Sequence, residues 1–289
     1  MDNDKIHILV YVSEALSQEY PMEIDSRNKK VFSCHPEMLR KIDFASRCAL
    51  EESFRIKERR GNVVISAMTV GLPEAECILR TCLGLGVDKA IQLTVDQLEY
   101  CDDYTIATLL SEYITQKEGE LILCGDYHEN YGYSQIGPIL AELLNYPFLS
   151  GIINLEIGEK GQITVQRKLT RGHRVKLEAF LPAVVSVNGI INEPRYISVH
   201  TQIKPMKGAI EKINLTHRNT RPIELISVGP FKPRAKKSVM PSDQLTAESK
   251  LNFLMSGGNI SKDSRKLLEG NIGEACDQII QLLKEENIL

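Results

Sequence analysis

Patterns of buried strands and of helices alternate along the first half of the chain. Apolar runs with the length and composition of buried strands lie at residues 6–12, 62–68, 90–95 and 121–124. Segments with the signals of helices lie at residues 44–60, 73–86, 102–113 and 134–144. Strands that alternate with helices of this length predict an open, mostly parallel, twisted sheet with helices on both faces. The predicted fold class is therefore α/β, of the nucleotide-binding, Rossmann-like kind.

Strand patterns of a different kind follow Tyr146. Residues 151–157, 162–169 and 174–180 are typical of antiparallel strands, and 183–187 return as a buried strand. A short hairpin is also predicted earlier in the chain, around residues 24–31. The predicted sheet therefore carries antiparallel strands in addition to its parallel ones.

The last third of the chain has little apolar periodicity. Residues 192–243 are rich in proline and positive charge, which favours an extended arm. Residues 273–286 have the spacing of an amphipathic helix. We therefore predict two parts: an α/β nucleotide-binding domain at 1–190, and a partner-binding arm, linker and C-terminal helix at 191–289.

Composition argues against several classes of function. A net charge of −3 gives no reason to expect a nucleic-acid partner, which usually needs a concentrated basic face. No stretch approaches the roughly 20 apolar residues that cross a bilayer, so no membrane insertion is expected. Seven cysteines without a C-x-x-C pair indicate reduced thiols and a cytoplasmic protein. The six histidines have no metal-ligand spacing and no nucleophile motif is present, so we expect neither a metal site nor catalytic residues.

The loop after residues 121–124 is the candidate nucleotide site. Ligands of open parallel sheets bind outside the carboxyl ends of strands where the strand order reverses. If strands 6–12 and 121–124 are neighbours, their following loops flank that crevice. Gly125 permits close backbone approach, Ser134 can cap the next helix, whose free N–H groups favour phosphate, and Gln135 could bind a ribose or phosphate oxygen. An ordinary strand-loop-helix junction contains the same parts, so both interpretations stay open.

This loop resembles the C-G-x-Q-A-I-D-x-D-x-x-Q-x-G-P loop of electron transfer flavoprotein beta subunits. The matching residues are Cys124, Gly125, Gln135, Gly137 and Pro138. In that family the loop surrounds an AMP, and in electron-bifurcating members a second FAD occupies the same place. The family's two aspartates fall on Asn130 and Gly132 here, and Tyr127 and Tyr133 replace other groups; they could stack on adenine or fill the pocket. The resemblance implies cofactor-binding residues at Tyr11, Asp43, Thr69, Val70, Gly71, Cys124, Gly125, Asp126, Asn130, Tyr133, Ser134, Gln135 and Gly137.

A second motif opens the arm. Asn192-Glu193-Pro194-Arg195-Tyr196, followed by Ser198-Val199 and Lys204, resembles the family pattern N-E-P-R-Y-x-S-L-x-x-I-M-K-A. Arginine can make a forked ion pair with a carboxylate. The family docks partner dehydrogenases through the apolar residue after the serine, so the resemblance implies partner docking by Arg195, Tyr196 and Val199. Alternatively, Arg195 and Tyr196 tie the arm to its own domain.

The resemblance covers most of the chain and implies the beta subunit of a heterodimeric electron transfer flavoprotein. Such a subunit, together with an alpha subunit, holds FAD, and electrons pass through the FAD from a flavoprotein dehydrogenase to an acceptor. It is an electron carrier subunit and not a self-contained enzyme. One alternative is an electron-bifurcating beta subunit that binds a second FAD and uses NADH. Another is a stand-alone adenine-nucleotide sensor, although a sensor needs no long arm.

Overall fold

The computed structural model describes residues 5–17, 23–25, 27, 30–32, 40–94, 102–115, 121–130, 132–196, 208–215, 226–227, 229, 246, 250–251 and 271–285. The chain divides into two compact units, Met1–Pro230 and Phe231–Leu289. The second unit contains helix α7 (Ile272–Glu285), close to the helix predicted at 273–286. The boundary predicted at residue 190 stays a prediction. None of the helices in the described segments is long and apolar enough to cross a membrane.

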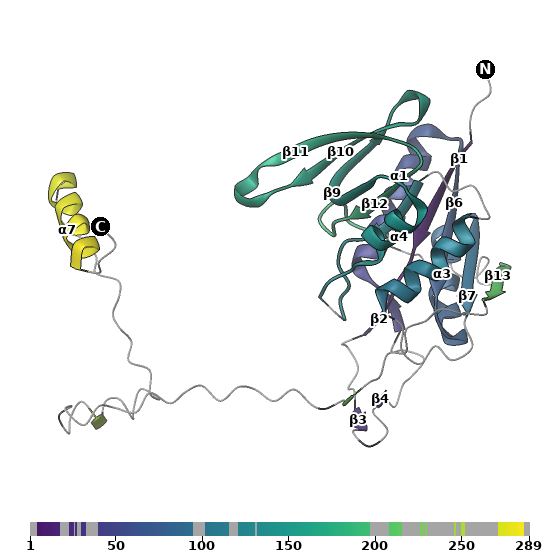
Figure 1. Cartoon of the computed structure of the whole chain (residues 1–289), viewed down its shortest axis with the longest axis horizontal. Coiled ribbons are helices and arrows are strands. Elements are labelled where there is room, and N and C mark those ends of the chain that lie inside the picture. Colours follow the sequence, from purple (N-terminus) through teal and green to yellow (C-terminus); the bar gives the residue numbers. More distant parts are fainter. Residues whose placement is uncertain are drawn as a thin grey trace. The chain divides into compact units, whose positions relative to one another are not determined.

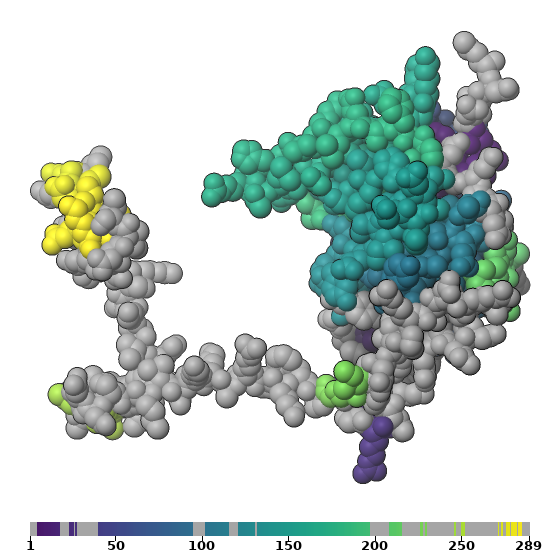
Figure 2. Space-filling view, viewed as in Figure 1, coloured from purple at the N-terminus to yellow at the C-terminus, as the bar shows by residue number. Residues whose placement is uncertain are grey.

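A mixed sheet is the centre of the first unit, and nine of the described strands form it in the order β11-β10-β9-β12-β8-β1-β6-β7-β13 (Figure 1). The strands are β1 (Ile6–Tyr11), β6 (Val63–Val70), β7 (Lys89–Thr94), β8 (Leu121–Gly125), β9 (Phe148–Ile157), β10 (Gln162–Lys168), β11 (Arg174–Phe180), β12 (Ala183–Val187) and β13 (Ile210–Asn214). Neighbours from β9 across to β13 pair in parallel, and β10 and β11 continue the sheet antiparallel beyond β9. The mostly parallel sheet with added antiparallel strands is confirmed. Figure 2 shows that β10 and β11 reach outward past the rest of this sheet.

Two small antiparallel pairs accompany the main sheet. They join β2 (Glu14–Leu16) to β5 (Arg40–Ile42), and β3 (Glu23–Asp25) to β4 (Lys30–Phe32). The second pair is the hairpin predicted around residues 24–31.

Helices cover both faces of the main sheet (Figure 1). One face is covered by α1 (Phe44–Arg60) and α2 (Glu76–Leu85), the latter preceded by a 3₁₀ turn at Pro73–Ala75, and the other by α3 (Asp103–Thr115) and α4 (Ile136–Leu144). Successive side chains of a strand point to opposite faces. In β1, Ile8 and Val10 therefore join the core under α1 and α2, whereas Leu9 joins the core under α3 and α4.

Helix α1 has the bounds that its sequence predicts. Its N-cap, Asp43, accepts hydrogen bonds from the first turn, and Gly61 ends the helix with a φ of 78°. A glycine adopts such a φ without the steric penalty that a Cβ would bring. Both ends are therefore encoded locally.

Helix α4 starts later than predicted. It begins at Ile136, and its N-cap is Gln135, so the predicted cap at Ser134 is wrong. Proline is tolerated in the first turn of a helix, where its missing N–H would have no intrahelical partner. With the observed start, Pro138 lies in that first turn; a cap at Ser134 would have placed it one residue deeper, where an N–H is needed.

Two strands differ from the prediction. β9 begins at Phe148, three residues before the predicted Gly151, which lies inside the strand with a φ of 63°. β13, from the predicted arm, was not predicted at all, and it pairs with β7 at the edge of the main sheet. Part of the predicted arm therefore belongs to the sheet of the first unit.

Candidate functional site

The carboxyl ends of β1 and β8 are neighbours, as the nucleotide-site prediction requires. β1 pairs in parallel with β8 on one side and with β6 on the other. From this pair the strand order runs outward in both directions, to β6 and β7 on one side and to β12 on the other. The strand order therefore reverses here, and the loops after β1 and β8 open at the same edge.

Asp43 links helix α1 to the loop after β8. Its side chain is fully buried, and Oδ2 accepts hydrogen bonds from the backbone N–H groups of Ala45 at 3.0 Å and Ser46 at 3.4 Å. Its other oxygen, Oδ1, accepts from the backbone N–H of Glu129 at 2.8 Å. One carboxylate thus caps the helix and fixes the loop.

Two glycines of the loop motif let helices approach the sheet. A Cβ on Gly125 would lie 2.8 Å from Cβ of Ala45, at the start of α1. A Cβ on Gly137 would lie 2.9 Å from Sγ of Cys124 and 2.9 Å from the ring of Phe148. Real Cβ atoms do not come so close to other heavy atoms, so both positions need glycine for packing.

Cys124 is a buried packing residue under α4. Its thiol contacts the carbonyl oxygen of Val185 at 3.7 Å, and burial raises its pKa to about 12. A thiol with such a pKa is protonated near neutral pH and is a poor nucleophile.

Further hydrogen bonds hold the loop between β8 and α4, one of them within the loop itself. Oδ1 of Asn130 accepts from the backbone N–H of Leu16 at 3.2 Å. The backbone N–H of Asn130 donates to Nδ1 of His128 at 3.2 Å, and that of Gln135 donates to Oδ2 of Asp103 at 2.6 Å. Asn130 therefore supplies a loop hydrogen bond where the family has a carboxylate. Tyr127 and Tyr133 are half exposed.

Asp126 follows β8 directly and is only partly satisfied. Its Oδ2 accepts from Nδ2 of Asn188 at 2.6 Å, whereas Oδ1 is buried and has no hydrogen-bond partner among the described residues. Burial raises the pKa of this carboxyl; the hydrogen bond from Asn188 works against the shift, and the charge of Asp43 adds to it. Asp126 is thus an acceptor that still lacks a donor.

The remaining predicted cofactor residues lie at the ends of β1 and β6. Tyr11 is buried in the core under α3 and α4, and Thr69 is buried near it at the end of β6. Val70 ends that strand, and the backbone N–H of Gly71 donates to the carbonyl of Leu93 at 3.1 Å. The structure therefore brings the predicted residues to one edge of the sheet. One group lies around the β8–α4 loop, and the other lies at the ends of β1 and β6.

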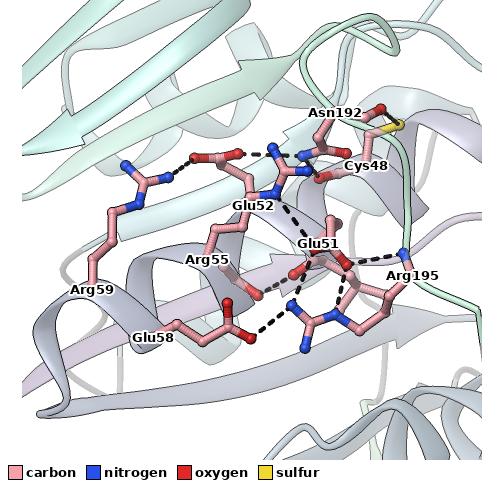
Figure 3. A network of polar contacts seen from close by, with 10 residues as sticks. Cys48, Glu51, Glu52, Arg55, Glu58, Arg59, Asn192 and Arg195 are labelled. Carbon is pink, nitrogen blue, oxygen red and sulfur yellow. Dashed lines mark hydrogen bonds and ion pairs between the residues drawn. The ribbon is translucent and has the colours of Figure 1, made fainter.

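The root of the arm is fastened to α1 by a polar network, which we call the arm anchor: Glu51, Glu52, Asn192 and Arg195 (Figure 3). Arg195 donates from Nε and Nη2 to the two carboxylate oxygens of Glu51, at 2.7 and 3.1 Å, and its guanidinium lies 4.8 Å from the ring centre of Phe54. Nδ2 of Asn192 donates to the carbonyl of Cys48 at 3.0 Å and to Oε2 of Glu52 at 3.3 Å. Arg195 therefore ties the arm to its own domain.

The other predicted docking residues differ from Arg195. Tyr196 is 88% exposed, directly after the arm anchor. Val199 lies outside the described residues. Partner docking by Arg195, Tyr196 and Val199 stays a prediction.

Glu51 and Glu52 are functional candidates that sequence reasoning missed. Their side chains are only 7% and 3% exposed. Buried carboxylates are rarely left unpaired. Two adjacent acids in the middle of a predicted helix were a usable signal, although not for which arginine would pair with them.

Comparison with known proteins identifies the family. The model of the electron transfer flavoprotein domain matches residues 37–217. An electron transfer flavoprotein subunit beta from Bacillus subtilis is 32% identical over 239 residues, which cover 82% of this chain and 83% of that protein. The chain belongs to the electron transfer flavoprotein beta-subunit family. Membership of this family supports a role in electron transfer.

Other relatives extend this picture along the chain. The electron transfer flavoprotein subunit beta of Methylophilus methylotrophus is 24% identical over 283 residues, which cover 97% of this chain and 98% of that protein. A subunit of Acetobacterium woodii named "Caffeyl-CoA reductase-Etf complex subunit CarD" is 32% identical over 152 residues, 52% of this chain and 57% of that protein. The likeness to the beta-subunit family therefore spans both the β8–α4 loop and the predicted arm.

Proposed function

We propose that this chain is the beta subunit of a heterodimeric electron transfer flavoprotein. With an alpha subunit it would hold FAD, which supplies the redox chemistry, and pass electrons from a flavoprotein dehydrogenase to an acceptor. The chain itself would contribute geometry, polarity and partner contacts. We propose the cytoplasm as its compartment, because Cys48, Cys77, Cys82, Cys124 and Cys276 are free thiols.

The arm anchor is the observation that carries this proposal. Arg195 donates to both carboxylate oxygens of Glu51 in a forked ion pair, and its Nη2 also donates to Glu58 at 2.9 Å. These contacts fix the position of the start of the arm. The next residue, Tyr196, is almost fully exposed. An exposed aromatic side chain on a fixed base suits recognition of another protein, because little has to be ordered on binding.

We further propose that the β8–α4 loop binds the adenine nucleotide. The loop offers the unsatisfied carboxyl of Asp126, which can accept from a ribose hydroxyl, and the side chains of Ser134 and Gln135 near the start of α4. Gly132, with a φ of 77°, adds a backbone conformation open to close approach. This set of groups fits a ligand with hydroxyl and phosphate oxygens.

The deciding experiment is the nucleotide content of the purified complex. The chain is co-expressed with a flavin-binding alpha subunit, the complex is denatured, and the released FAD and AMP are quantified. We expect one FAD and one AMP per heterodimer. Failure to co-purify with any flavoprotein would overturn the carrier proposal and favour a nucleotide sensor.

A variant tests the loop itself. The side chain of Gln135 makes no hydrogen bond within the described residues, so Gln135→Ala should lower nucleotide occupancy without loss of stability. Gln162→Ala, on an antiparallel strand away from the loop, is the matched control. Equal occupancy in both variants would argue against the proposed site.

A second FAD in place of AMP is the alternative occupant, as in an electron-bifurcating subunit that uses NADH. The loop chemistry suits this occupant as well as AMP: Asn130 and Gly132 replace two carboxylates that would repel the phosphate of either nucleotide. The same nucleotide analysis separates the two, because two FAD and no AMP would support bifurcation.

A further inference from the structure

A cavity of about 640 Å³ lies beside the nucleotide loop, on the side of β12, β9 and β10. Its volume falls within the roughly 300–1,000 Å³ that is typical of small-molecule sites. Four apolar side chains line part of it: Pro138, Phe148, Leu169 and Ile190. The rest of the lining is polar and charged. The cavity is therefore suited to a molecule with both an apolar body and a polar end.

A distortion of β9 shapes this cavity. Between the pairs Val185–Leu149 and Val187–Ile152, β9 has one residue more than β12, so Ser150 and Gly151 together face Ser186. Gly151 takes up this extra residue with a φ of 63°, and its N–H donates to Oγ of Ser186 at 3.0 Å. β10 also shifts register against β9, between Gln166 and Arg167. Bulges of this kind re-aim side chains and are frequent beside binding sites.

Arg167, at the register shift, has most of its hydrogen-bonding capacity unused. Its Nη1 donates to Oγ of Ser150 at 3.0 Å, and this is its one hydrogen bond within the described residues. Its Nε is buried and has no partner there. The next residue, Lys168, also lines the cavity and pairs with no carboxylate of the described residues. A buried N–H without an acceptor is unfavourable, so an acceptor from outside the chain that reaches Nε would stabilise this arrangement.

The acid across the cavity does not fill that role. Asp126 lines the same cavity, but its Oδ2 accepts from Asn188, and its Oδ1 has no donor among the described residues. Thus an arginine and an aspartate share one cavity without forming an ion pair with each other. Nε of Arg167 lacks an acceptor, and Oδ1 of Asp126 lacks a donor, among the described residues.

We propose that this cavity binds a small organic anion, whose carboxylate or phosphate contacts Arg167 and Lys168. Its apolar body lies against Phe148 and Ile190. Arginine presents a planar fork that matches the oxygens of such an anion. Asp126 and Ser134 line both this cavity and the proposed nucleotide site, so the anion is assigned only to the groups on β10, Phe148 and Ile190, and Asp126 is left to the nucleotide.

Calorimetric titration of the full chain with phenyl phosphate and with benzoate tests the proposal. The two probes share a ring and differ in the oxyanion, so they distinguish a phosphate ligand from a carboxylate ligand. Ionic strength is held constant with NaCl, so that the screening of charges is the same in every titration. We expect saturable binding of at least one probe. Arg167→Gln should weaken it about 10-fold to 100-fold, the usual effect of removing a charge-assisted hydrogen bond.

The control carries the same change of charge nearby. Arg171→Gln alters the exposed turn after β10, does not line the cavity, and should bind the probes as the unaltered chain does. Lys168→Gln provides a second cavity variant, and circular dichroism confirms that each variant is folded. Absence of saturable binding by the unaltered chain, or equal weakening in Arg167→Gln and Arg171→Gln, would overturn the proposal. Because FAD and AMP content is measured separately, a chain that binds neither probe could still be an electron transfer flavoprotein subunit.

Discussion

Arg195 encloses the carboxylate of Glu51, a residue 144 positions earlier in the chain, with three N–H groups. Nε and the backbone N–H of Arg195 donate to Oε2 at 2.7 and 3.0 Å, and Nη2 donates to Oε1 at 3.1 Å. A forked pair of this kind fixes both distance and orientation. The contact therefore determines where the arm leaves α1.

Removing the charge of Glu51 should weaken this contact. We expect Glu51→Gln to lower the free energy of unfolding by about 1–2 kcal/mol, because hydrogen bonds to a charged partner are lost while Arg195 stays partly solvated. Urea denaturation measures the change. Glu58→Gln is the control, since the Glu58 side chain is 60% exposed and should contribute little. Equal effects of the two variants would contradict the central place given to Glu51.

The same pair predicts a response to acid. Burial raises the pKa of Glu51, but the hydrogen bonds and charge of Arg195 outweigh burial and hold that pKa below its ordinary value. The unfolded chain therefore binds a proton at this carboxyl more readily than the folded chain does. The stabilisation is present above the unfolded-state pKa, near 4.5, and is lost as pH falls below it through the folded-state pKa.

The free energy of unfolding, measured across that range, should consequently fall less steeply in Glu51→Gln than in the unaltered chain. Glu76, whose pKa is also lowered by hydrogen bonds from Lys212 and Arg80, contributes equally to both proteins. Parallel acid curves would show that Glu51 is not linked to folding in this way.

Asp43 should not be fully replaceable by asparagine or by alanine. Asparagine is a good N-cap, but it has one side-chain oxygen where Asp43 uses two, so in Asp43→Asn an NH₂ group faces the N–H of Glu129; Asp43→Ala loses the cap as well. We expect a loss of about 1–2 kcal/mol for asparagine and about 2–3 kcal/mol for alanine. Hydrogen exchange adds a local readout: the Glu129 amide should lose protection in both variants, and the Ala45 amide only in Asp43→Ala. Unchanged exchange of the Glu129 amide in both variants would refute the link between cap and loop.

The exposed side chain after the arm anchor should matter for partners and not for folding. Tyr196→Ala should leave the unfolding midpoint unchanged, because the side chain is 88% exposed. It should nevertheless slow electron transfer from the dehydrogenase, and Val199→Ala should do the same with flavin content intact. Stopped-flow reduction of the heterodimer measures this rate. An unchanged rate in both variants would exclude the arm as the docking element.

Local signals account for the parts of the fold that the sequence predicts well. Asp43 and Gly61 mark both ends of α1, and the apolar run at 183–187 is β12. The carboxyl edge that holds the predicted nucleotide residues follows from strand order alone. These features depend on neighbours within a few positions or on periodicity.

Non-local contacts account for the parts that were missed. β13 is a short edge strand with a mostly exposed pattern, and only its distant partner β7 makes it a strand. Gly151 is the first residue of the predicted strand 151–157, whereas it lies at a bulge inside β9, because glycine occurs both at strand ends and at bulges. The pairing of Arg195 with Glu51, and the meeting of Arg167 with Asp126 in one cavity, depend on packing across the sheet, which single-sequence patterns do not encode.

β13 also bears on how the arm meets a partner. The arm is fixed at Arg195 on one side of Val199, and at Ile210, where β13 begins its pairing with Ala90, on the other. The stretch predicted to dock a partner therefore lies between two positions held by the first unit. A loop with both ends held has fewer conformations to give up than a tail of equal length. A partner that docks there would consequently meet a segment for which the fold of the subunit has already borne part of the loss of entropy.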